Sequence, residues 1–362
     1  MAAWPGVHFA TASVEDADSL LDALRPHAPI AGIFHLAGLV EHSRRRPEVM
    51  YRVHVAGTLN VLRTALDLVR ARSQPPEMHR DRPLTVTAPA ARSGVTRTAQ
   101  GIRRVVYAST SGTVACSNSM APIGDDAPYA TTLVRTWPYY HSKIVAEQEA
   151  ADFVRRYPQL ELVVMRPTLV LGPGDDRRSS VTLIDEFLKG RIPLVPSGGL
   201  SYVDVRDAAA AFRAAMAHQV RRRWSPLAGD AGVLAFSHAP DAVWPGAVVL
   251  SLQGAAGRSY LISATNVTHA DLYKQLERIS GVRAPRLRLP GVLVVWLLRI
   301  LYFILRLLGI WLKEKDPVWA EMGNVYWSID ASRAKRELGF QPRPPEETLR
   351  ATIDWLRSRS PR

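Results

Sequence analysis

Short apolar runs alternate with longer helical patterns through residues 5–220, and this alternation constrains the fold more than any other feature. Three of the runs, at residues 30–36, 103–108 and 160–165, have the length and composition of buried strands. Helical patterns at 47–71 and 139–157 lie between and beside them. Strands and helices that alternate at this spacing predict an α/β fold, a doubly wound parallel sheet with helices on both faces.

The length of 362 residues allows two domains, because a domain takes about 100–200 residues. We expect the larger domain to comprise residues 1–175, 201–220 and 258–265, and a smaller, mainly helical one to comprise 176–200 and 266–362. Two stretches, 72–100 and 221–246, are rich in residues typical of loops and are predicted to be surface insertions. In the smaller domain, Thr268 with Asp271 predicts a helix start, and a further helix is predicted to end at Gly339.

Charge and cysteine content exclude several classes of protein. The net charge is +13, but the basic residues are scattered and no nucleic-acid-binding motif is present, so we expect no nucleic-acid partner. The single cysteine, Cys116, excludes a disulfide scaffold and a cysteine-built zinc site, and we expect no metal site. It also fits a reducing compartment, so we expect a cytoplasmic location.

An apolar segment at residues 289–312 is long enough to meet a membrane, but Arg299 and Arg306 interrupt it. Each arginine near the middle of a bilayer costs about 2.5–3.5 kcal/mol, which disfavours a spanning helix. Two interpretations remain open. The segment is either a helix lying in the headgroup layer, as on the endoplasmic reticulum or another membrane, or a buried helix of the smaller domain.

The sharpest local feature is the run Pro138-Tyr139-Tyr140-His141-Ser142-Lys143. Pro138 suits the first turn of a helix, so Tyr139 and Lys143 are predicted to lie at i and i+4 on one helical face. An ammonium group beside a phenol favours the phenolate, which predicts a lowered pKa for Tyr139. Such a tyrosine can exchange a proton with an alcohol or carbonyl while a hydride moves to or from a nicotinamide. The alternative is a surface lysine beside a packing tyrosine.

A cluster of hydroxyl residues follows the predicted strand at 103–108 and includes Ser111. The carboxyl ends of parallel strands are where open α/β sheets bind ligands. A Ser111 hydroxyl at this position could hydrogen-bond a reacting oxygen, although a turn would also use serine. Together, Ser111, Tyr139 and Lys143 are the predicted catalytic residues.

With these residues in place, the chain resembles the extended short-chain dehydrogenase/reductase superfamily. Within it, the nearest resemblance is to the 3β-hydroxysteroid dehydrogenase/isomerase branch, with its sterol-4α-carboxylate 3-dehydrogenase and dihydroflavonol reductase relatives. The motifs that carry the resemblance are IFHLAG at 33–38, VAGTLNVL at 55–62, VVYASTSGTV at 105–114, YYHSK at 139–143, RPTLVLGPGD at 166–175, SYVDVRDA at 201–208 and AKRELGFQP at 334–342.

The resemblance implies a Rossmann-type sheet with a smaller substrate domain, and NAD or NADP as cofactor. It assigns the catalytic triad to Ser111, Tyr139 and Lys143, and gives Lys143 a second role on the nicotinamide ribose. The cofactor-binding positions that it implies are Ser13, Val14, Leu36, Ala37, Gly38, Pro167, Thr168 and Leu169.

The sequence departs from the family at its beginning. The glycine-rich phosphate turn is not found, and residues 7–12 resemble the third strand of the fold, so the sheet is predicted to be N-terminally incomplete by about 50 residues. We expect the edge of the strand at 30–36 to be open, and we expect either a misassigned start or impaired cofactor binding. In addition, His54 stands where the family usually has asparagine.

These observations predict an NAD(P)-dependent dehydrogenase or reductase that interconverts a secondary alcohol and a ketone. The predicted substrate is small and lipophilic, most simply a 3β-hydroxysteroid or sterol of steroid biosynthesis, reached through peripheral membrane contact at 289–312. A homodimer is expected. The alternatives are a nucleotide-sugar epimerase or dehydratase, a dihydroflavonol-type reductase, and a catalytically impaired fragment.

Overall fold

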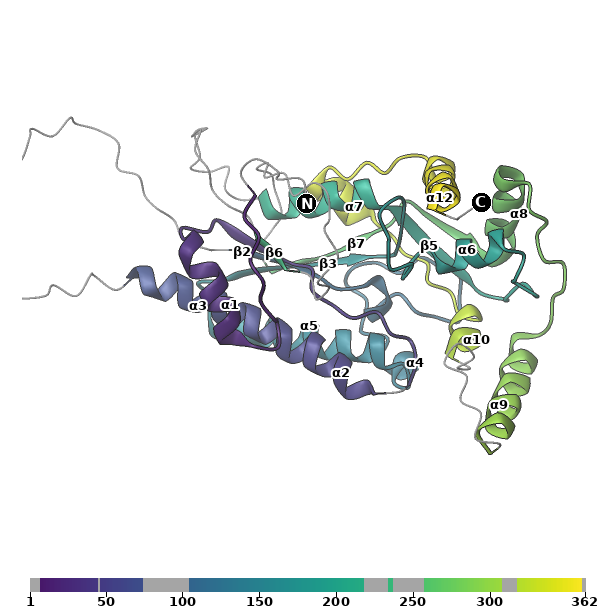
Figure 1. Ribbon diagram of the computed structural model, residues 1–362, viewed down its shortest axis with the longest axis horizontal. Helices are drawn as coiled ribbons and strands as arrows, with labels where there is room; N and C mark the ends of the chain where they lie inside the picture. Colours follow the sequence, from purple (N-terminus) through teal and green to yellow (C-terminus); the bar gives the residue numbers. More distant parts are fainter. Residues whose placement is uncertain are drawn as a thin grey trace, which may run out of the picture.

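The computed structural model describes residues 7–44, 46–73, 104–217, 234–236, 257–307 and 318–359. Its main sheet has five strands, all parallel, in the order β6-β1-β2-β3-β7 (Figure 1). The strands are β1 (Gly32–His35), β2 (Arg104–Ala108), β3 (Glu161–Pro167), β6 (Leu234–Phe236) and β7 (Ser259–Ile262). The predicted Rossmann-type parallel sheet is therefore confirmed.

Helices cover both faces of this sheet. Because side chains of a strand alternate between faces, Val105 and Tyr107 of β2 pack on one side and Val106 on the other. The first face carries α1 (Ala17–Leu24), α3 (Gly57–Ser73) and α5 (Pro138–Arg156), and the second carries α7 (Val205–Ala217) and α11 (Ser332–Leu338) (Figure 1).

The helix predicted at 47–71 forms, with a change of winding in its first half. It consists of α2 (Pro47–Tyr51), a π turn (Arg52–Ala56) and α3. The π turn contains His54, which is 1% exposed. π turns inside α-helices occur often at functional sites, because they reorient the side chains of one turn.

A second sheet organises the C-terminal part of the chain. Its strands are β4 (Leu169–Leu171), β5 (Gly199–Asp204) and β8 (Thr265–Thr268), with β4 and β5 parallel and β5 and β8 antiparallel. It shares an apolar core with α6 (Thr182–Leu188), α8 (His269–Ser280) and α12 (Pro345–Arg359).

Both helix-end predictions in this part are confirmed. Thr268 caps α8, because its hydroxyl accepts the Asp271 N–H at 3.1 Å. Gly339 ends α11 with a φ of 64°, a backbone conformation that glycine adopts without strain.

Two N-terminal predictions are wrong. Residues 7–12 form no strand, because a strand needs a partner for its backbone groups and no neighbouring strand is available to them among the described residues. The edge of β1 is also not open, since β6 pairs with it in parallel, with Ile33 opposite Leu234. β6 lies inside the stretch 221–246 that was predicted to be loop; the rest of that stretch and residues 74–100 of the other insertion lie outside the described residues.

The predicted apolar helix is present as α9 (Gly291–Leu307), which projects from the body of the molecule beside α10 (Val318–Gly323) (Figure 1). Its apolar side chains are largely exposed, with Val292 at 74%, Phe303 at 61% and Leu307 at 71%. The prediction of a buried helix is therefore not met. Within the described parts of the chain, no helix is long and apolar enough to cross a bilayer. Residues 308–312 of the predicted segment lie outside those parts.

Candidate functional site

The candidate site lies where three parallel strands end at the same edge of the sheet. Residues 36–38 follow β1, Ser111 follows β2 in a 3-10 turn (Ser111–Thr113), and Pro167 is the last residue of β3. The carboxyl edge of a parallel sheet is the usual ligand-binding edge of this architecture. The fold therefore brings three separate predicted segments to one place.

Lys143 lies on the first turns of α5, which begins at Pro138 as predicted and packs against the turn that carries Ser111. The Lys143 side chain is 4% exposed, and its ammonium donates a hydrogen bond to the Ala108 carbonyl at 2.9 Å. Burial lowers the pKa of Lys143 to about 8, although the Glu147 carboxylate opposes this shift. At neutral pH, Lys143 is thus a buried cation at the end of β2.

The predicted lowering of the Tyr139 pKa is wrong. Burial raises the pKa of Tyr139 to about 12, and only a hydrogen bond with the Thr110 side chain acts in the opposite direction. The Lys143 ammonium is engaged by the Ala108 carbonyl and makes no such contribution to the phenol. Tyr139 is therefore a protonated phenol at neutral pH, the form that donates a proton.

The hydroxyl cluster at the end of β2 contacts this phenol through the Thr110 side chain. Ser111 is 5% exposed, and the neighbouring Thr110 accepts the Gly112 N–H at 3.3 Å as the cap of the 3-10 turn. Thr110 is not among the catalytic or cofactor-binding residues predicted from the sequence. Thr110 belongs to the hydroxyl cluster seen in the sequence. Only the geometry of the turn, in which Thr110 is the cap and Ser111 the first residue, shows that the two have different contacts.

The loop after β1 closely approaches Lys143. A Cβ atom added to Gly38 would lie in ordinary van der Waals contact with two side chains, 3.4 Å from the Lys143 Nζ and 3.6 Å from the His54 Nε2. Ala37 is buried, and Leu36 is 37% exposed at the edge of the site. The loop after β1 therefore lies next to the buried ammonium group of Lys143.

The other predicted cofactor residues occupy two places. Thr168 is 8% exposed and bonds the Ile262 carbonyl through both its N–H and its hydroxyl, which fixes the chain between Pro167 and Leu169. Val14 is 3% exposed, packs in the core and uses its carbonyl to accept the Asn60 amide, while the Ser13 hydroxyl accepts the Glu15 N–H. The side chain of Val14 thus serves packing.

The buried ion pair of Glu147 and Arg166 is hydrogen-bonded to the hydroxyl cluster that follows β2. The Glu147 carboxylate accepts three hydrogen bonds from the Arg166 guanidinium, the shortest at 2.5 Å, and the two side chains are 1% and 7% exposed. The hydroxyls of Ser109 and Thr113 also donate to Glu147. Glu147 therefore ties α5 and β3 to the loop that carries Thr110 and Ser111.

Aromatic side chains enclose the Tyr139 ring. The His42 ring meets Tyr139 edge-on, with centroids 5.3 Å apart, and meets Trp319 of α10 at 4.8 Å. Tyr140 lies 4.9 Å from Tyr139 and 4.8 Å from Trp327. Burial lowers the pKa of His42 to about 4, so this ring is neutral at neutral pH and contributes an uncharged aromatic contact to Tyr139.

One carboxylate connects these surroundings to the exposed helix. Glu321 of α10 accepts hydrogen bonds from Trp137 at 2.9 Å, from Arg44 at 2.5 Å and from Arg299 of α9 at 2.7 Å. Trp137 is the residue before α5, two positions ahead of Tyr139. Glu321 therefore links α9 to the start of α5.

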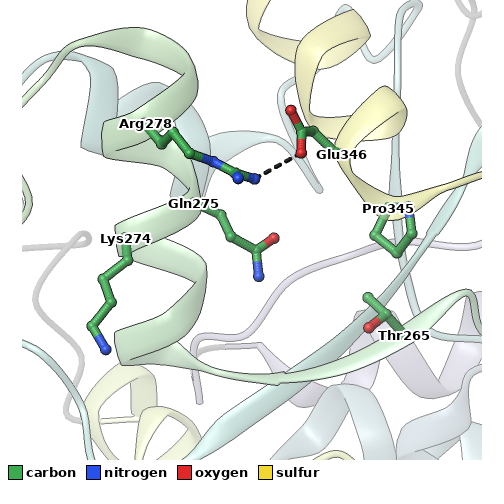
Figure 2. A pocket seen from close by; sticks show the side chains of 6 residues that line it. All are labelled: Thr265, Lys274, Gln275, Arg278, Pro345 and Glu346. Atoms are coloured by element: carbon green, nitrogen blue, oxygen red, sulfur yellow. Dashed lines mark hydrogen bonds and ion pairs between the residues drawn. The ribbon is translucent and has the colours of Figure 1, made fainter.

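A separate open cavity of ≈ 480 Å³ lies between β8, α8 and α12 (Figure 2). It is lined by Thr265, Lys274, Gln275, Arg278, Pro345 and Glu346. Figure 2 shows Arg278 and Glu346 pointing toward each other across it, paired at 2.7 Å. No residue of the candidate site contributes to its lining.

Comparisons with known proteins agree with this architecture. A Synechocystis relative, whose name gives dihydroflavonol 4-reductase as a provisional activity, is 22% identical over 90% of this chain and 76% of its own length. Sterol demethylase protein B of Methylococcus capsulatus is 24% identical over 72% of this chain and 68% of its own length. The UDP-glucose 4-epimerase of Thermus thermophilus, solved with NAD, superposes with a TM-score of 0.61 at 17% identity, covering 99% of this chain and 87% of that one.

The comparison with protein-family models shows to which family this chain belongs. The model of the NAD dependent epimerase/dehydratase family matches residues 2–224, which is more than half of the chain. NAD dependence, predicted from the Tyr139 and Lys143 motif and from the resemblance, is part of that family's description. The chain belongs to the NAD dependent epimerase/dehydratase family.

Proposed function

We propose that this chain is an NAD(P)-dependent oxidoreductase that interconverts a secondary alcohol and a ketone on a lipophilic ring, a 3β-hydroxysteroid or sterol intermediate. The observation that carries the substrate class is the contact of the Tyr139 ring with the rings of His42 and Tyr140, with Trp319 packed in turn against His42. A nucleotide sugar needs hydrogen bonds to its hydroxyl and phosphate groups, whereas flat apolar rings pack against aromatic walls.

In this proposal, residues of α5 and of the turn after β2 have separate roles in the reaction. When bound, the dinucleotide supplies or accepts the hydride. Tyr139, protonated at neutral pH, donates its proton to the substrate oxygen during ketone reduction, and Ser111 holds that oxygen by a hydrogen bond. Lys143, charged below about pH 8, lies beside Gly38 to bind the ribose, as the family resemblance implies.

Two relatives support different substrates. Sterol demethylase protein B agrees with a sterol, while the epimerase fold agrees with the alternative of a nucleotide-sugar epimerase or dehydratase. Likeness to that solved structure, at 17% identity, shows the fold alone. The aromatic surroundings of Tyr139 favour the sterol over the sugar.

We further propose that α9 rests on a membrane surface, from which a lipophilic substrate would enter. Its exposed apolar side chains include Val292, Trp296 and Phe303 at 59–74%, far more apolar area on one helix than water favours. Through Arg299 and Glu321, this helix joins the start of α5. A cytoplasmic membrane face and a homodimer complete the proposal.

The test compares reduction of a 3-ketosteroid by NADH or NADPH, the direction in which a protonated Tyr139 acts as the acid, with turnover of UDP-glucose by the full chain. Tyr139→Phe should lower steroid turnover by about 100-fold or more, since a positioned acid/base contributes about that much. Tyr157→Phe, at the other end of α5, is the matched control and should leave turnover unchanged. An active Tyr139→Phe protein would refute the mechanism, and turnover of the sugar alone would favour the alternative.

A further inference from the structure

We propose that His54 is a positioning residue that fixes the loop after β1 against the catalytic turn of α5. This proposal rests on the proposed function of Tyr139 and Lys143. It concerns the position at which this chain carries histidine and the family usually carries asparagine. The hydrogen bonds of His54 join two parts of the candidate site, the loop after β1 at Leu39 and the first turns of α5 at Ser142.

The directions of these bonds follow from one backbone group. The Leu39 N–H can only donate, so the His54 Nε2, 3.1 Å away, accepts. A neutral imidazole with an accepting Nε2 carries its proton on Nδ1, which therefore donates to the Ser142 Oγ at 2.8 Å. The Ser142 hydroxyl donates in turn to the Tyr139 carbonyl at 2.9 Å.

This chain of bonds lies entirely inside the protein. His54 is 1% exposed and Ser142 is 0% exposed, so water does not compete for the two bonds. The His54 ring also meets the Tyr139 ring edge-on, with centroids 5.6 Å apart. The imidazole thus touches the catalytic residue and is bonded to the turn that carries it.

At its other end, this series of hydrogen bonds holds the predicted cofactor-binding loop through the Leu39 N–H. Leu39 directly follows Gly38, whose added Cβ would lie 3.4 Å from the Lys143 Nζ. The His54 bond therefore sets the distance between the loop at 36–39 and the turn that bears Tyr139 and Lys143. The π turn places His54 at this junction, although two bonded partners lie 15 and 88 residues away in the sequence.

The experiment measures binding of NADH and NADPH by fluorescence titration, which needs no substrate. His54→Leu and Ser142→Ala each break the chain of bonds, and each should weaken dinucleotide binding by about tenfold or more, because small displacements in such sites are costly. The double variant should be no worse than the single variants, since the bonds act as one unit.

The matched control is Tyr51→Phe. The Tyr51 hydroxyl bonds the His141 Nδ1 at 2.6 Å, which is also an imidazole bond between the 47–56 segment and α5, one residue from Ser142. This variant loses a helix–helix bond without touching Leu39 or Tyr139, so dinucleotide binding should be unchanged. Equal weakening by Tyr51→Phe would show a general packing effect and overturn the proposal.

The tautomer of the His54 ring can be measured by NMR, and a residue that served only packing would have no preference for one tautomer. Nitrogen-15 NMR of the full chain should show His54 as the Nδ1–H tautomer with an unprotonated Nε2, and His54→Asn should restore binding only partly, because the shorter amide reaches the Ser142 side alone. An Nε2–H tautomer, or unaltered binding in His54→Leu, would refute the role. If Tyr139→Phe were active, the proposed function would fail while these binding and NMR results still decided the role of His54.

Discussion

Lys143 donates a hydrogen bond from its ammonium group to the carbonyl oxygen of Ala108, 2.9 Å away at the end of β2. This bond is made inside the protein, where a cation costs free energy. It holds the ammonium next to the loop that contains Gly38. The pKa of about 8 makes this cost measurable as a pH dependence of stability.

The first prediction concerns Lys143→Met. Because the pKa of Lys143 is near 8 in the folded protein and 10.5 in the unfolded chain, the unfolded state binds more protons between these pH values. The native protein should therefore gain stability as pH rises from 8 to 10.5, relative to the variant. At pH 7, Lys143→Met should be more stable by about 1–3 kcal/mol and inactive. Urea unfolding at pH 7, 9 and 10.5 tests this, and a difference that does not change with pH would contradict it.

The second prediction concerns the buried pair of Glu147 and Arg166. Arg166→Met leaves an unpaired buried carboxylate and should destabilise the protein by about 3–5 kcal/mol, whereas replacing both partners with apolar residues should cost less. Denaturant midpoints provide the measurement. The exposed pair of Asp152 and Arg155 is the control, and Asp152→Asn should change stability by less than about 1 kcal/mol.

The third prediction concerns α9. Leu297→Glu with Phe303→Glu places two charges on exposed apolar positions, so the fold should remain intact. Binding to vesicles of phosphatidylcholine and phosphatidylserine should weaken at least about tenfold, because each apolar side chain contributes about 1.5–3 kcal/mol when buried. Co-sedimentation measures the binding. Met120→Glu, at an apolar position of similar exposure outside α9, should leave vesicle binding unchanged. If the native protein did not bind vesicles, the proposed membrane contact would be refuted.

The fourth prediction concerns the pairing of β6 with β1. Ala235→Pro removes a backbone donor and disturbs the ladder opposite Phe34, so amides of β1 that face β6 should exchange faster with solvent. Hydrogen exchange measured at Ile33, Phe34 and His35 tests the pairing. Amides of β2, which lie between β1 and β3, should keep their protection. Unchanged exchange throughout β1 would mean that β6 does not protect this edge.

Features fixed by local geometry were predictable from the sequence. Pro138 begins α5, and the four-residue spacing of Tyr139 and Lys143 puts both on one face, because helix geometry depends only on neighbouring residues. Thr268 and Gly339 mark helix ends for the same reason. The alternation of strands and helices was sufficient for the parallel sheet.

Features that depend on distant residues were not predictable. The pKa of Tyr139 is set by burial and by Thr110, which the motif around Tyr139 does not contain. The bonds of His54 join Leu39 and Ser142, which no periodic pattern relates. A strand of three residues at 234–236 is too short to show a period of two, so the sequence pattern there indicates a loop.

The parallel pairing of β6 with β1 also affects how the chain is made. The residue opposite Ile33 is Leu234, which is synthesised 201 positions later. Because translation adds about 5–20 residues per second, β6 is synthesised on the order of 10–40 s after β1, and β1 lacks this second neighbour during that time. During that interval its outer edge offers unpaired backbone groups to other nascent chains. Slower translation of the central part of the message should therefore lower the yield of native protein, and chaperones that shield strand edges should restore it.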